Sequence, residues 1–234
     1  MSNEKSFNEW LGGLIDGNGQ ILVTKKGYAY FKIVLPEKDK SILYEIKHKF
    51  GGSIKNISGS NSFKYKLHHK KGLAKMVYSI NGLIRNPAKL LQLNKVCVLY
   101  NIDCKCNIPL TYNSRWFSGI IDANGSITLN EQCDQLILSI TLKNRLLLDP
   151  LNKLFMGRVK ILNSKDAFKY SIFRKNEILD LIDNYFSKYP LISNKAHKLK
   201  IIKDFYLYNN YKEELNKPDK LYKWINFKNK WDKL

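Results

Sequence analysis

The chain carries one twelve-residue stretch twice, and this internal repeat limits its possible folds more than any other feature. WLGGLIDGNGQI occupies residues 10–21, and WFSGIIDANGSI occupies residues 116–127. The tripeptide FKY occurs at 63–65 and again at 168–170, and Phe50 and Phe155 each stand two residues before a glycine. These landmarks recur after 105 or 106 residues. Sequence that repeats at a fixed period predicts a repeated structural unit, so we expect two similar halves.

The repeat also sets the expected boundaries. We place the first repeat at 5–100 and the second at 111–208, with a linker at 101–113 that overlaps the start of the second repeat. The segment 212–234 lies outside both repeats. Within it, Trp224, Phe227 and Trp231 follow helical spacing, which predicts a basic-aromatic helix that packs on the body.

Each half reads as the same series of elements, αββαββα. A helix ends at Gly17–Gly19 in the first half and at Gly125 in the second, because glycine favours helix termini. We expect Ser6 to cap the first helix, with Glu9 completing a capping box. Alternating apolar and polar residues then predict strands, such as the two that turn at Lys26–Gly27. One helix closes each half.

The charge of the chain points to a polyanionic partner. Forty Lys and Arg against 20 Asp and Glu give a net charge of +20, and a protein this basic typically binds nucleic acid. In the SFKYKLHH strand Lys64, Lys66 and His68 alternate with apolar residues, so one sheet face should be basic and suited to a duplex groove. The expected nucleic-acid contacts are Lys25, Lys26, Lys32, Lys64, Lys66, His68, Lys169 and Arg174.

Other features narrow the class of protein. No apolar run is long enough to span a bilayer, and the polar N-terminus has no secretory h-region. We therefore expect an intracellular protein without a membrane partner. The four cysteines are not spaced as in a zinc ribbon or finger. Frequent Lys, Asn, Ile and Tyr reflect A/T-rich codons, which suggests an organelle, a mitochondrion or a chloroplast.

Small residues recur on one face of each motif helix: Gly12, Gly13, Ser118 and Gly119. They would let the two helices approach closely and bring their C-terminal ends together at the centre of the molecule. LGGLIDGNG (11–19) and FSGIIDANG (117–125) resemble the two signature motifs of the LAGLIDADG homing endonucleases and intron maturases. The resemblance covers essentially the whole chain. It implies an α+β fold in which two pseudo-symmetric αββαββα repeats form a saddle of two antiparallel sheets, with the motif helices at the repeat interface.

The same resemblance implies a site for a divalent metal, Mg²⁺, at the end of each motif helix. The family's metal-binding acid stands one place before the final glycine, where this chain has Asn18 and Asn124. An Asn keeps the shape of an Asp and loses its charge, whereas Mg²⁺ prefers anionic oxygen. Asp16 and Asp122 match the family's other acidic position, which we interpret as structural.

The resemblance further assigns a catalytic basic residue to Lys195, with Arg85 as its first-half counterpart and Lys89 as the alternative. The family's polar residue after the second strand is not evident; Glu37 is a weak candidate in the first half, and none lies near Leu142. We therefore expect a monomer with an internal pseudo-two-fold that binds nucleic acid and is impaired in site-specific double-strand DNA cleavage. An endonuclease in which Asn was introduced by engineering is one reading. The alternative is an RNA-binding maturase, or a component of an organellar RNA–protein assembly such as a mitochondrial ribosome.

Overall fold

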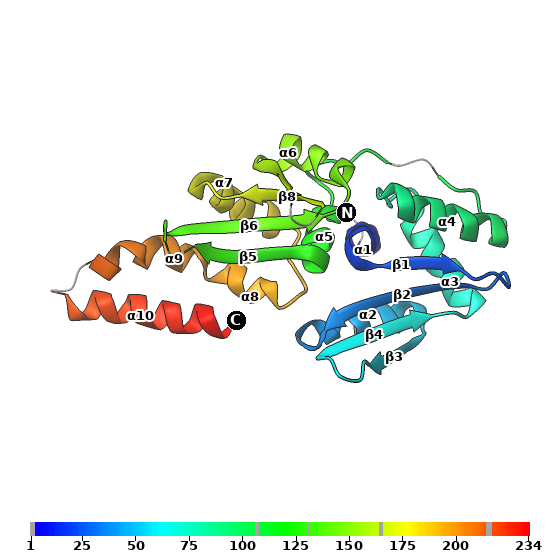
Figure 1. The fold of residues 1–234 in the computed structure, drawn as a ribbon, viewed down its shortest axis with the longest axis horizontal. Coiled ribbons are helices and arrows are strands. Elements are labelled where there is room, and N and C mark those ends of the chain that lie inside the picture. The colour runs from blue at the N-terminus through cyan, green and yellow to red at the C-terminus, as the bar shows by residue number, and fades with distance from the viewer. Residues whose placement is uncertain (1–2, 106–107, 131, 164–165, 214–216) are drawn as a thin grey trace.

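The computed structural model describes residues 3–105, 108–130, 132–163, 166–213 and 217–234, and it contains the two expected halves (Figure 1). The elements of the first half are α1 (Asn3–Asn18), β1 (Gln20–Val23), β2 (Ala29–Pro36), η1 (Glu37–Asp39), α2 (Lys40–Phe50), β3 (Ser53–Asn56), β4 (Ser62–Leu67), α3 (Lys70–Ile80) and α4 (Pro87–Tyr100). The second half begins at the next motif helix. Its elements are α5 (Trp116–Asn124), β5 (Gly125–Asn130), β6 (Gln135–Leu142), η2 (Arg145–Leu147), α6 (Asp149–Phe155), β7 (Arg158–Leu162), β8 (Ala167–Ile172), α7 (Lys175–Asp180), the π-helical η4 (Leu181–Phe186), α8 (Lys195–Lys200) and α9 (Ile202–Tyr208).

Each half contains one four-stranded antiparallel sheet, as predicted. The strand order is β1-β2-β4-β3 in the first sheet and β5-β6-β8-β7 in the second, so the topology is the same in both. The registers also correspond, because Tyr65 pairs with Ile33 and Tyr170 pairs with Ile140. Both tyrosines are fully buried under the helices of their own half.

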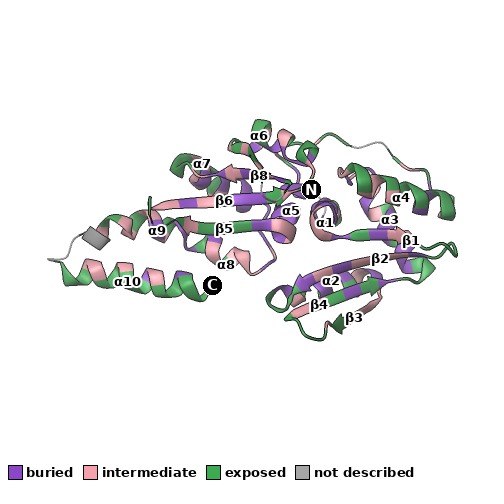
Figure 2. Ribbon diagram, viewed as in Figure 1, coloured by how far each residue is buried: buried purple, intermediate pink, exposed green. Residues whose placement is uncertain are grey.

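Burial alternates along the strands, so each sheet has one buried face and one more exposed face (Figure 2). In β2, Ala29, Phe31, Ile33 and Leu35 are buried, and the residues between them are only half-buried. The buried residues join α1, α2 and α3 in one hydrophobic core, and a second core forms around β6, β8 and the later helices. The opposite face of each sheet carries the polar and basic residues.

Three local expectations differ from the structure. Helix α1 already includes Asn3, so Ser6 lies inside the helix and does not cap it. Glu9 instead accepts a hydrogen bond from the backbone N–H of Arg115 at 2.9 Å, where it caps the start of α5 in the other half. The closing segment of each half is broken into several helices, and the stretch before β7 is split into η2 and α6, since Pro150 suits only the first turn of a helix.

The C-terminal segment forms α10 (Pro218–Lys233), with η5 (Asn209–Glu213) preceding it. Phe227 and Trp231 are buried, and the ring of Phe227 lies 5.9 Å from that of Phe205 on α9. The aromatic face of α10 thus packs on the second half, as its helical spacing predicted (Figure 1). Among the described ranges, every helix is too short or too polar to span a bilayer.

Candidate nucleic-acid interface and central site

The two motif helices, α1 and α5, pack against each other along the middle of the molecule. A Cβ added at Gly13 would lie 2.0 Å from the carbonyl oxygen of Trp116, and one added at Gly119 would lie 1.9 Å from that of Trp10. The two contacts are equivalent, so the helices are related by the pseudo-two-fold expected from the repeat. Only glycine allows backbones to approach this closely.

Gly12 and Ser118 do not lie in this interface. A Cβ at Gly12 would meet Leu83 of the same half at 3.1 Å. At the equivalent position, Ser118 donates a hydrogen bond from its hydroxyl to the carbonyl of Tyr189, also in its own half. The small residues therefore divide between two neighbours: one of each pair faces the other helix, and one faces the closing segment of its own half.

The motif acids are used by the fold. The Trp10 indole N–H donates to Asp122 at 2.8 Å, and the Trp116 indole N–H donates to Asp16 at 2.9 Å, so these bonds cross between the halves. Each carboxylate also accepts two backbone N–H groups from its own closing segment, at Arg85 and Asn86 or at Ile192 and Ser193. Burial raises the pKa of Asp16 to about 6, against the lowering effect of these donors. The geometry supports a structural role for both acids.

A lysine lies at the C-terminal end of each motif helix. Lys89 donates to the carbonyls of Ile15 (2.6 Å) and Asp16 (2.9 Å), and Lys195 donates to the carbonyl of Asp122 at 2.7 Å. A cation at this end of a helix is favourable because the carbonyls there carry partial negative charge. Burial lowers the pKa of Lys89 to about 8 and also lowers that of Lys195, while nearby acids oppose the shift.

Lys89, and not Arg85, is therefore the positional counterpart of Lys195. The Arg85 side chain donates to the carbonyl of Ile108 in the linker and lies over the Trp116 ring, 5.6 Å from its centroid. The choice of Arg85 from sequence was wrong in position because that residue precedes α4, while Lys89 lies in its first turn and can reach the end of α1.

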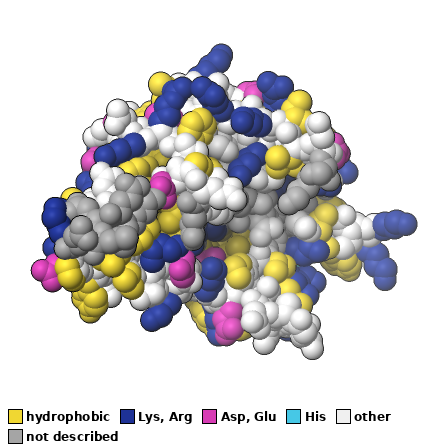
Figure 3. All heavy atoms as spheres, turned by 60° about the vertical axis from the view of Figure 1, so that its left-hand side comes forward, with side chains coloured by type: hydrophobic (Ala, Val, Ile, Leu, Met, Phe, Trp, Pro, Cys, Tyr) yellow, Lys and Arg dark blue, Asp and Glu magenta, His cyan; other side chains and the backbone are white. Residues whose placement is uncertain are grey.

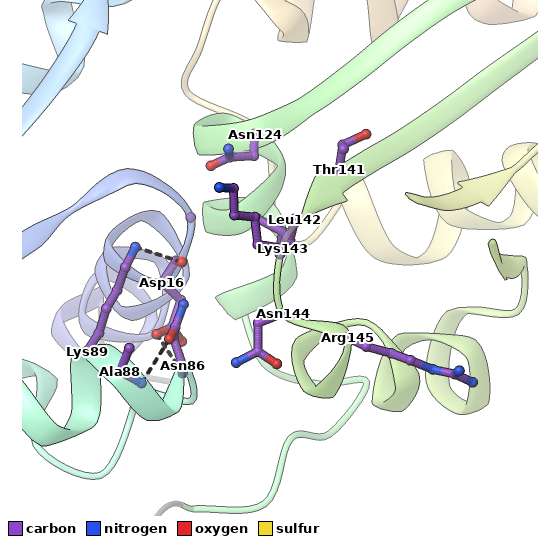
Figure 4. A pocket seen from close by; sticks show the side chains of 11 residues that line it. Asp16, Asn86, Ala88, Lys89, Asn124, Thr141, Leu142, Lys143, Asn144 and Arg145 are labelled. Carbon is purple, nitrogen blue, oxygen red and sulfur yellow. Dashed lines mark hydrogen bonds between the residues drawn. The ribbon is translucent and has the colours of Figure 1, made fainter. Parts of the chain in front are cut away.

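A cleft of about 570 Å³ opens beside the end of α1, between the halves (Figure 4). Lys89 and Asn86 face it from the first half, and Asn124, Thr141 and Lys143 face it from the second. Lys143 directly follows β6, at the place of the family's polar residue for which the sequence offered no candidate. Glu37 directly follows β2 in the first half.

The two Asn side chains are held differently. Asn18 donates from its side-chain nitrogen to the carbonyl of Val34 on β2, at 2.6 Å. The side-chain oxygen of Asn124 is buried and has no hydrogen-bond partner among the described residues, and it would lie 2.6 Å from a Cβ at Gly17.

The side chains at the ends of the two motif helices do not provide the ligands that a hard divalent cation needs. Mg²⁺ and Ca²⁺ require several oxygen ligands, usually with carboxylates among them, but both nearby carboxylates already accept three N–H donors. The described residues contain no cluster of three or more His, Cys, Asp or Glu side chains able to hold a metal. The ammonium groups of Lys89 and Lys195 also donate hydrogen bonds to the helix-end carbonyls.

The expected basic residues fall in two groups. Lys32, Lys64, Lys66 and Lys169 lie on the polar sheet faces, opposite buried neighbours, and the exposed His68 directly follows β4. Lys25 and Lys26 lie in the exposed β1–β2 turn. Arg174 follows β8 and forms a 2.7 Å ion pair with Glu177 of α7, so its charge is balanced by the helix. Sequence reasoning missed Lys55, Arg158 and Lys160, which the same alternation could have identified.

Basic side chains are also spread over the outer surface. Figure 3 shows Lys and Arg side chains across the face that carries the second half and α10. Positive charge is therefore spread over much of the surface, and on the sheet faces the basic residues are spaced regularly by the alternation of the strands.

Comparison with known proteins places the chain in a family. The sequence profile described as LAGLIDADG endonuclease matches residues 11–100 and 117–206, which are the two repeats. The chain is 38% identical to the intron-encoded RNA maturase bI4 of Saccharomyces cerevisiae, an alignment that covers 97% of this chain and 36% of that protein. It is 32% identical to the intron-encoded DNA endonuclease ai2a of Dictyostelium discoideum, covering 98% and 76%. The chain spans little more than a third of the yeast maturase, and the same is true of a probable intron-encoded endonuclease, aI2, of Debaryomyces hansenii.

Solved structures show the same fold. The I-LtrWI LAGLIDADG homing endonuclease bound to target DNA superposes with a TM-score of 0.65 at 21% identity, covering 97% of this chain and 98% of that one. I-SmaMI bound to an uncleaved DNA target in the presence of calcium ions gives 0.64 at 18% identity, covering 95% and 97%. Both repeats match the family profile, and a relative 32% identical is covered over most of its length, so the chain is a two-repeat member of the LAGLIDADG endonuclease family.

Proposed function

We propose that this chain binds a nucleic-acid duplex across its two sheet faces and does not cleave it by metal-dependent chemistry. The observation that carries the proposal is the central site, where Asn18 and Asn124 stand in place of acids, and Asp16 and Asp122 each already accept three N–H donors. The sheet faces meanwhile keep their basic side chains. Such a protein retains the means to bind a duplex and lacks the charge needed to hold a catalytic cation.

The family's use of divalent metal does not extend to this site in our proposal. The structure of I-SmaMI with calcium ions supports divalent metal use by that relative. Here the acids at the two motif helices are engaged by indole and backbone N–H groups, so Mg²⁺ would find neutral amides and two ammonium groups. A direct test is calorimetric titration with Ca²⁺ of the chain and of an Asn18→Asp/Asn124→Asp variant. Heat of binding from the unchanged chain would contradict the proposal.

RNA is the second candidate partner. It is favoured by the 38% identity to a protein named an RNA maturase. It is also favoured by the central site, where Asn18 and Asn124 replace the acids that DNA cleavage would require. The deep major groove of A-form RNA is poorly accessible to side chains, so a basic saddle would bind RNA mainly through phosphates and shape. This reading includes the possibility of a larger RNA–protein assembly. Intron-encoded relatives and the frequent Lys, Asn, Ile and Tyr residues, whose codons are rich in A and T, support an organellar location, in a mitochondrion or a chloroplast.

The test is a competition between structured intron RNA from the source of this chain and a random-sequence duplex DNA library, over a salt series. On duplex DNA, log affinity falls as log salt concentration rises, and each phosphate contact should make this slope steeper by roughly 0.9. DNA sequences that remain bound at high salt would support a DNA-binding scaffold, and salt-resistant binding of the RNA alone would support the maturase reading. Failure to bind either polymer at low salt would refute the proposal.

A further inference from the structure

Lysines stand directly opposite each other on the polar faces of both sheets. In the first sheet Lys55 of β3 pairs with Lys64 of β4, and in the second sheet Lys160 of β7 pairs with Lys169 of β8. Directly opposed residues of antiparallel strands point to the same face, with Cβ atoms about 5 Å apart. Each pair therefore places two lysine side chains next to each other on the same face of the sheet.

The two pairs are equivalent under the pseudo-two-fold. Tyr65 and Tyr170 occupy the same place in their sheets, and the paired lysine of β4 or β8 comes one residue earlier in each. The neighbouring row of each sheet is not the same in the two halves, so the repeated lysine pair is more than an effect of the chain's many lysines. The structure thus contains one lysine pair in two symmetric copies.

The row one residue after each tyrosine differs. In the first sheet this row contains a third opposed pair, Lys32 of β2 with Lys66 of β4. In the second sheet the same two positions are Ser139 and Ser171. The charge that the second half has in this row is Arg158, which is opposite Ser171 on the edge strand and lies over the ring of Phe173. The two faces therefore match in one row and differ in the next.

No acidic side chain among the described residues forms an ion pair with these six lysines. Like charges placed directly opposite each other destabilise a sheet, so each pair weakens the free protein. In the first half three of them, Lys55, Lys64 and Lys66, line a recess of about 330 Å³ together with Ser53 and His68. An anionic oxygen between two ammonium groups would remove the repulsion and form charge-assisted hydrogen bonds with both.

We propose that Lys55–Lys64 and Lys160–Lys169 are two equivalent binding sites for backbone phosphates, and that Lys32–Lys66 adds a third such site in the first half alone. The inference rests on the proposed binding of nucleic acid. The Lys55–Lys64 and Lys160–Lys169 pairs would bind the nucleic-acid backbone in the same way in both halves. The additional Lys32–Lys66 pair would make binding by the first half depend more strongly on salt. The second half has no opposed lysine pair in this row, because Ser139 is buried and Ser171 is uncharged.

The test compares double Lys→Gln variants of the three pairs with a charge-matched control. Lys47 and Lys153 serve as that control, because each is exposed on a helix behind its sheet and replacing both also removes two charges. Affinity for duplex DNA and for intron RNA is measured over a salt series, and the melting temperature of the free protein is measured in parallel. A Ser171→Ala variant serves as an uncharged control on the strand that carries Lys169.

Each lysine-pair variant should lower the salt slope on duplex DNA by about 0.9 if the pair shares one phosphate and by about 1.8 if each lysine takes its own. The Lys55–Lys64 and Lys160–Lys169 variants should lose the same amount. Their free proteins should melt about 1–4 °C higher than the unchanged chain, because repulsion is removed. The Ser171→Ala control should keep the full slope, because it removes no charge.

Pair variants that bind with the slope of the control, while the unchanged chain still binds in a salt-dependent way, would overturn this inference and leave the proposed function standing. A fall in melting temperature with no change in slope would likewise overturn it, since the lysines would then be structural. If the unchanged chain binds neither polymer at any salt concentration, the proposed function fails and the inference fails with it. The two polymers separate DNA phosphates from RNA phosphates as the ligand.

Discussion

The contact between Gly13 and α5 gives a prediction for which the neighbouring Gly12 is a matched control. Real Cβ contacts essentially never fall below 3.0 Å, whereas an alanine methyl at Gly13 would lie 2.0 Å from the carbonyl oxygen of Trp116. Gly13→Ala must therefore separate the two helices by about 1 Å, because a backbone carbonyl cannot rotate away. Gly12→Ala places its methyl 3.1 Å from Leu83, which requires a shift of a few tenths of an ångström.

The cost of Gly13→Ala follows from what the helix interface holds. A radial gap of about 1 Å removes a quarter to a half of the dispersion energy of the facing atoms. The Trp10–Asp122 and Trp116–Asp16 hydrogen bonds cross the same interface and would lengthen. Overpacking and weakened buried hydrogen bonds together cost about 2–4 kcal/mol. Both variants gain about 1 kcal/mol of helix propensity, so this gain cancels in the comparison.

The measurement is the free energy of unfolding of the two variants in urea, followed by tryptophan fluorescence and circular dichroism. Gly13→Ala should be less stable than Gly12→Ala by about 2–4 kcal/mol. Equal stabilities for the two variants would refute the view that the helices meet through backbone contact at this glycine.

Three further predictions concern single side chains. Burial holds the pKa of Asp16 near 6, above its ordinary 3.8, so the indole N–H resonance of Trp116 should titrate with a midpoint near pH 6, and a flat resonance would count against it. Because this pKa is raised, the contribution of Asp16 to stability is greatest at acid pH and falls as pH rises from about 4 to about 6. Trp231→Ala should cost about 3–5 kcal/mol and increase hydrogen exchange in α10, whereas the same change at the exposed Tyr222 should do neither. Lys195→Met should cost about 1–2 kcal/mol through the loss of the helix-end contact, and calorimetric melting checks it; unchanged stability would argue for a role outside the fold.

Local patterns in the sequence predicted the sheets well. The alternation in SFKYKLHH predicted that Lys64 and Lys66 would point to the face of the sheet opposite to the buried Tyr65. This could be predicted because strand periodicity depends only on neighbouring residues. The repeat then carried the same arrangement to Tyr170.

Long-range partners could not be predicted in the same way. Nothing near Glu9 in sequence indicates that it caps a helix 106 residues away, and the crossed Trp–Asp bonds join residues at least 100 apart. Arg85 and Lys89 were ambiguous because both are basic and close to the same helix start; only the path of the chain before α4 separates them. The family resemblance located the central site, but the engagement of its carboxylates by N–H donors required the structure.

The central claim is that this chain holds a duplex without cutting it, and a cleavage assay tests that claim most directly. A randomised duplex DNA library is incubated with the chain at saturating concentration and low salt, with Mg²⁺ and in parallel with a chelator, and the products are sequenced for double-strand ends. We predict bound and intact duplexes under both conditions. Double-strand ends at defined sequences that require Mg²⁺ and disappear with the chelator would contradict the account.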